Sequence, residues 1–185
     1  KRNNRPGGRK NRRGPEMKQN YFIMYLIIVG VQLLICNYFH VTAYITLSLL
    51  PCAILCMPTK IGPSSAMLIA FATGLTVDFL AEGIVGINAL ALVPVAGARR
   101  WIFDMIIGKE IIASGEDISM KKHGVGAMLP AIVIAQSIFL FIYIWADGAS
   151  ARPAMFNILR FVLSLITGSA LSLIMAQMLD PNERK

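Results

Sequence analysis

The sequence has little charge and few residues of the kinds that carry catalysis or bind metals. Only 15% of its 185 residues are charged, against roughly a quarter in a typical soluble domain. It holds two histidines and three cysteines, and it lacks a Ser-His-Asp set, a phosphate-binding loop and an HExxH pattern. Cys52 and Cys56 are four residues apart without a histidine or carboxylate beside them, so we expect buried free thiols. The composition therefore favours neither an enzyme nor a protein with a metal or other cofactor.

The apolar residues, 56% of the chain, are gathered into long blocks. Each block has roughly the 17–25 residues that cross a bilayer as a helix, with charges only at its edges. We therefore expect an all-α, polytopic transmembrane bundle of about six spans, forming one domain over 17–180. We expect the prolines inside these blocks to kink the helices without ending them, because neighbouring helices can bind the backbone carbonyls that lose their hydrogen bonds. The expected spans are 21–36, 41–57, 61–80, 84–103, 124–145 and 154–178.

The basic residues predict the orientation of the bundle. Seven of the first thirteen residues are Lys or Arg, in a stretch, 1–16, too polar to fold and expected to be disordered. Such a tail beside a span is typical of topology control and of contact with anionic lipid, so we do not expect nucleic acid as a partner. If this tail and the short tail 181–185 are both cytoplasmic, only Arg152 and Arg160 face the other side, which satisfies the positive-inside rule.

The interval 104–123 is the longest stretch expected outside the bilayer. Its isoleucines alternate with charged and small polar residues, a pattern that fits an amphipathic helix at the cytoplasmic interface or a loop lying on the membrane. Lys109, Lys121 and Lys122 make it the best candidate for a cytoplasmic docking surface.

Small residues recur every four positions in two of the expected spans. Ala66, Ala70 and Gly74 do so in the third, and Ser164, Gly168 and Ser172 in the sixth. Small residues at this spacing let helix backbones approach closely in lipid. We expect these faces to pack inside the bundle, with a partner interface as the alternative.

Asp78 is the one carboxylate expected inside the hydrocarbon region. An ionisable group there is costly and is a candidate functional residue by default. Asn88 lies where it could reach Asp78 across the turn at 82–86. We expect a clasp between the third and fourth spans, with a partner contact and a transport or proton role as alternatives.

The segment GLTVDFLAEGIVGINALAL at 74–92 resembles the MreD family, the rod shape-determining membrane proteins of bacteria. The stretch 32–58, which ends in Pro58, resembles the version of that family found in Bacteroidetes. The family pattern is a Gly-Leu-x-x-Asp segment that closes one helix, followed by a glycine-containing turn that opens the next. The matching positions are Gly74, Leu75 and Asp78 in the first part and Gly83, Gly86 and Asn88 in the second.

The resemblance implies a non-enzymatic scaffold of the cell-elongation machinery, which directs peptidoglycan synthesis and cell shape from the bacterial inner membrane. MreC is the implied principal partner, and MreB, RodA and the transpeptidase partner of RodA are further ones. The resemblance also implies a fold similar to that of the substrate-binding components of energy-coupling-factor vitamin transporters. Such a component is the alternative function, although the first span offers only Gly30 in place of the Ala-xxx-Ala pair usual in their docking helix. An orphan structural membrane protein is a third reading.

Overall fold

The computed structural model describes residues 16–38, 45–58, 61–82, 85–106, 108, 120–148 and 153–178. In these ranges every regular element is helical, as the sequence predicted. The elements are α1 (Glu16–Tyr38), α2 (Leu50–Leu55), α3 (Pro63–Val77), a π-helical turn η1 (Asp78–Glu82), α4 (Ile87–Ile106), α6 (Met120–Gly148) and α7 (Ala154–Met178).

Three helical stretches in the described residues are long and apolar enough to cross a membrane. They are Pro63–Ala81, Gly126–Asp147 and Ala154–Gln177, and α1 adds the shorter apolar stretch Ile23–Tyr38. A helix rises about 1.5 Å per residue, so about 20 residues match a hydrocarbon core about 30 Å thick. The chain is therefore a helical membrane protein. The 20-residue α4 is not among the three, because its last turns carry Arg99, Arg100 and Asp104.

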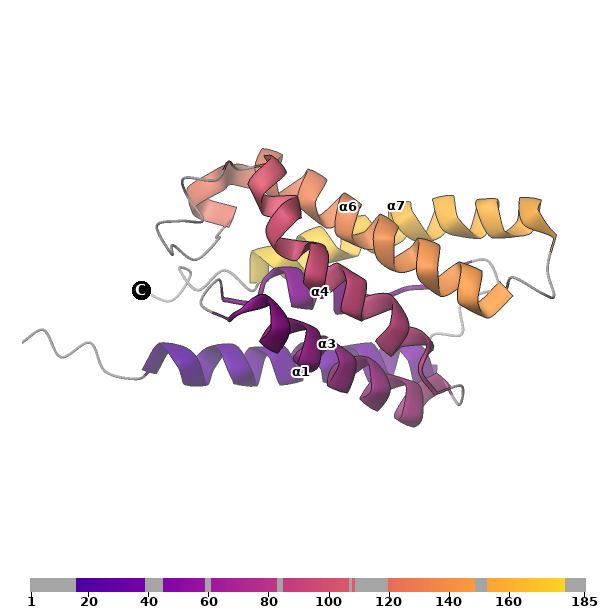
Figure 1. Ribbon diagram of the computed structural model, residues 1–185, viewed down its shortest axis with the longest axis horizontal. Helices are drawn as coiled ribbons and strands as arrows, with labels where there is room; N and C mark the ends of the chain where they lie inside the picture. Colours follow the sequence, from indigo (N-terminus) through magenta and orange to yellow (C-terminus); the bar gives the residue numbers. More distant parts are fainter. Residues whose placement is uncertain are drawn as a thin grey trace, which may run out of the picture.

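Consecutive helices form antiparallel neighbours. α3 packs on α4, α4 on α6, and α6 on α7. The connections from α3 to α4 and from α6 to α7 are short, which favours antiparallel neighbours. Figure 1 shows that α1 and α6 begin, and α4 and α7 end, toward the same end of the bundle, at the left of the view. The predicted topology requires these helix ends to share one side.

The structure corrects the second predicted span. Instead of a spanning helix over 41–57, residues 45–49 are non-helical and α2 has only six residues, about 9 Å of helix. The physical reason is Pro51, which lies in the first turn of α2. A proline that lacks an N–H is best placed where a helix begins, so Pro51 starts the helix instead of kinking a longer one.

α2 is the most deeply buried element of the described bundle. All six of its residues are buried, and it contacts α1, α3, α4, α6 and α7. The buried apolar residues of α2 belong to one continuous core, to which α4 and α6 also contribute. The non-helical residues that precede α2 must therefore find partners for their backbone polar groups inside the protein.

Several expectations fall partly or wholly outside the described residues. Residues 1–15, the tail 181–185, Gly83 and Lys109 lie outside them, and so does the middle of the proposed amphipathic helix, of which 107 and 109–119 are not described. α4 extends to Ile106 and α6 begins at Met120, so both ends of the interval 104–123 belong to long helices. The backbone at Lys121 and Lys122 is thus the first turn of α6.

Candidate functional site

The Asp78 carboxylate lies completely buried where α3 passes into η1. It accepts four hydrogen bonds from the start of α4. Its Oδ2 accepts from the backbone N–H groups of Gly86 at 2.9 Å and Ala89 at 3.3 Å. Its Oδ1 accepts from the backbone N–H of Asn88 at 3.0 Å and from Asn88 Nδ2 at 2.9 Å. A negative charge on the unpaired N–H groups of a helix N-terminus is favourable, so Asp78 caps α4 from another helix.

Two glycines allow this cap to form. A Cβ on Gly74 would lie 2.5 Å from the backbone N and Cα of Ala89, so only glycine lets α3 and α4 come this close. Gly86 has a φ of +109°, a backbone conformation that side chains with a Cβ rarely adopt. Gly74, Asp78, Gly86 and Asn88 therefore build a single contact, the one expected between the third and fourth spans.

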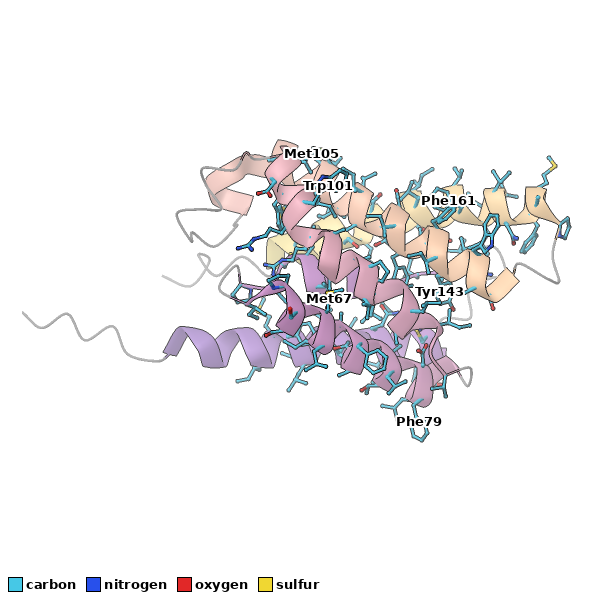
Figure 2. All side chains as sticks on the ribbon, viewed as in Figure 1. Met67, Phe79, Trp101, Met105, Tyr143 and Phe161 are labelled. Carbon is cyan, nitrogen blue, oxygen red and sulfur yellow. The ribbon has the colours of Figure 1, made fainter. Side chains whose placement is uncertain are left out.

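The π-helical turn η1 carries both a buried side chain of this contact and an exposed apolar one. Asp78 is buried, whereas Phe79 is 75% exposed and points away from the bundle at the lower edge of Figure 2. Leu75, which the sequence pattern groups with Gly74 and Asp78, is also exposed and takes no part in the cap. In a membrane such apolar side chains meet lipid or a partner helix.

A second polar site surrounds the non-helical residues 45–49. Gln32 of α1 donates from Nε2 to the Leu47 carbonyl at 3.2 Å and accepts the Leu49 N–H at 2.7 Å. Ser164 of α7 accepts the Thr46 N–H at 2.8 Å. Side chains from different helices thus replace hydrogen bonds that a continuous helix would make within itself.

Two arginines hold segment 45–58, which joins these non-helical residues to α2, one near each end. Arg160 of α7 donates from Nε to Thr46 Oγ1 at 2.9 Å and pairs with Asp147 at 2.6 Å. Arg99 of α4 donates from Nε to the Leu55 carbonyl at 3.1 Å, and its Nη2 donates to the Met57 carbonyl. A cation is favourable at the carbonyl end of a helix, so Arg99 stabilises the C-terminus of α2.

The faces predicted from small residues are buried. Ala66 and Ala70 are 1% exposed or less, and Ser164, Gly168 and Ser172 are buried. On α7 this face follows segment 45–58: Ser164 contacts Thr46, and the Ser172 carbonyl accepts from Cys52 Sγ at 3.3 Å. The faces therefore serve packing within the bundle.

Sequence reasoning missed the second site. It counted the arginines, Arg99 and Arg160 among them, only as charges for topology. It gave no role to Gln32 or to Gln136 of α6, which donates from Nε2 to the Ser48 carbonyl at 3.1 Å. A signal was present, because glutamines inside apolar blocks must find partners in the bundle. The backbone groups that these glutamines bind could not be predicted, since the sequence pattern indicated a second spanning helix, whose backbone groups would be paired within the helix.

Cavities and side-chain clusters in the described residues offer little chemistry. A shallow depression of about 330 Å³ between α6 and α7 is lined by Ser137, Ile138, Phe141, Ile142 and Phe161. Its one hydroxyl, that of Ser137, donates to a carbonyl of its own helix. No group of three or more metal-ligating side chains occurs in this part of the chain.

The fold and the two sites define a helical membrane protein whose buried polar residues join its own helices. Comparison of the chain with models of known protein families, with curated proteins and with solved structures found no match.

Proposed function

We propose that this protein is a non-enzymatic membrane scaffold of the bacterial cell-elongation machinery that pairs with an MreC-like protein. The proposal rests on the resemblance of residues 74–92 to the MreD family. The supporting structural observation is that the Asp78 carboxylate is used entirely as a helix cap, with four N–H donors from the start of α4. A carboxylate held in this way organises the bundle and is not presented to a substrate.

The proposed setting is the inner membrane, with about six membrane-crossing segments and both termini in the cytoplasm. Here the buried segment 45–58 would count as one crossing, because non-helical backbone is tolerated at membrane depth when protein surrounds it. The positive-inside rule supports this orientation. It places the end of α4 and the start of α6 on the cytoplasmic side, where MreB and the cytoplasmic parts of RodA and its transpeptidase partner would be met.

Affinity purification of the tagged protein from its native membrane, followed by mass spectrometry, tests this function. We expect MreC, together with RodA or its transpeptidase partner, to copurify. A tagged, unrelated membrane protein of similar size expressed to the same level is the control. Copurification of an ATPase pair with a coupling subunit would instead establish the vitamin-transporter component, and recovery of neither set would leave the chain outside both machineries.

A charge-reversal experiment tests the proposed cytoplasmic docking surface. Changing Lys109, Lys121 and Lys122 to Glu should weaken capture of the cytoplasmic partner while membrane insertion is unchanged. Reversal of Lys18, near the start of α1, is the matched control and should leave capture intact. Loss of insertion in the triple variant would show that these lysines determine topology instead of docking.

A further inference from the structure

Three buried polar side-chain atoms on segments that pack around the start of α2 have no hydrogen-bond partner among the described residues. They are Ser48 Oγ, Gln136 Oε1 and Ser172 Oγ. The three residues are at most 2% exposed. Because buried polar groups in proteins are nearly always paired, directly or through ordered water, three such unpaired atoms on neighbouring segments require an explanation.

Three contacts show that the segments carrying these residues lie side by side. Gln136 donates from Nε2 to the Ser48 carbonyl at 3.1 Å. Gly168 lies one helical turn before Ser172, and a Cβ on it would be 2.5 Å from Gln136 Nε2. Cys52, which follows Ser48 by four residues, donates to the Ser172 carbonyl at 3.3 Å. The orphan atoms thus belong to three segments that touch one another: the non-helical residues before α2, α6 and α7.

We propose that Ser48, Gln136 and Ser172 form an internal water site that joins the non-helical segment to α6 and α7. The donor and acceptor inventory fits water. Gln136 Oε1 only accepts hydrogen bonds, whereas each serine hydroxyl both donates and accepts. One water can donate to the amide oxygen, donate to one hydroxyl and accept from the other, and buried waters typically make about three such bonds.

Charge argues against a cation in the same place. The three side chains are neutral, and no contact among the described residues brings a carboxylate to them. Arg160 lies nearby, since it binds Thr46, two residues before Ser48. A cation would be buried beside this positive charge with only three neutral side-chain oxygens, so water is favoured over sodium.

A double-mutant cycle tests the site in the full-length, detergent-solubilised protein. Ser48→Ala, Ser172→Ala and the double variant are melted beside the wild type. If one water joins both hydroxyls, either substitution disrupts its hydrogen-bond set, so the double variant should lose less melting temperature than the two single losses added together. Ser137→Ala combined with Ser48→Ala is the control pair and should be additive, because Ser137 Oγ bonds to the Val133 carbonyl within α6.

Additive losses in the Ser48 and Ser172 cycle would overturn the proposal. A high-resolution experimental map of the wild type provides a second test that no folding failure of the variants can affect. We expect a density peak at hydrogen-bond distance from Ser48 Oγ, Gln136 Oε1 and Ser172 Oγ, and absence of this peak would refute the site. If the wild-type melting temperature is higher in sodium chloride than in choline chloride, and Ser48→Ala abolishes the difference, the site binds a cation instead of water.

Discussion

Replacement of Asp78 by alanine should cost more stability than any other single change at the contact between α3 and α4. The substitution leaves four N–H donors of the α4 N-terminus without their acceptor. Gly86 is partly exposed and can be rehydrated, whereas Asn88 and Ala89 are buried. Each buried donor left unpaired costs about 1–3 kcal/mol, and the lost charge at the helix N-terminus adds roughly 0.3–2 kcal/mol.

Asn88 supplies two of the buried donors and Ala89 the third. At about 1 kcal/mol each, the lower end of that range, they predict together with the charge effect a loss of about 4 kcal/mol. For a chain of this size, each kcal/mol corresponds to about 2–4 °C. We therefore expect the melting temperature in detergent to fall by roughly 8–16 °C. Asp78→Asn, which keeps one acceptor oxygen, should fall between the alanine variant and the wild type.

Thr76→Ala is the matched control for this prediction. Thr76 lies on the same helix, but it is exposed and its hydroxyl donates to the Ala72 carbonyl within α3, so its loss should change the melting temperature little. A fall for Asp78→Ala no larger than that of Thr76→Ala would refute the cap as a source of stability. An unchanged melt together with lost capture of MreC would assign Asp78 to a partner contact.

Three further substitutions test the sites through the same melting assay or through thiol labelling. Gly74→Ala should destabilise by about 1–3 kcal/mol or more because its Cβ meets backbone, whereas Gly30→Ala, with nothing within 4 Å, should not; equal melts would refute the close approach. Arg99→Gln should loosen the end of α2 and raise the rate at which maleimide labels the half-buried thiol of Cys56, which follows the last residue of α2. Arg100→Gln, at an exposed position, is the control and should leave the labelling rate unchanged. Gln32→Leu leaves one N–H and one C=O unpaired and should cost about 2–4 kcal/mol; a melt equal to that of the wild type would show that water replaces the glutamine.

The contact around Asp78 was predictable because its partners are close in the sequence. Asp78 and Asn88 are ten residues apart, on two helices joined by a short turn. Such a turn can only bring the end of one helix beside the start of the next. A lone carboxylate in an apolar segment also demands donors, and the unpaired N–H groups of a helix start are the nearest ones.

The site around segment 45–58 was not predictable, because its partners are remote. Ser164 is 118 residues from Thr46, and Gln136 is 88 residues from Ser48. Hydropathy records only that residues 41–57 are apolar, and an apolar block reads equally well as a spanning helix or as a core segment enclosed by protein. Which of the two forms depends on whether other helices supply hydrogen bonds to its backbone.

The sequence by itself determined the helical membrane class, the limits of α7 and the buried small-residue faces, since each follows from local composition and a four-residue repeat. The tertiary structure alone decided that the second apolar block is a short internal helix held by arginines at both ends. The physical reason is that unpaired backbone groups are too costly to leave in an apolar interior. A broken helix can therefore exist only where the assembled bundle places polar side chains, here Gln32, Arg99 and Arg160, against it.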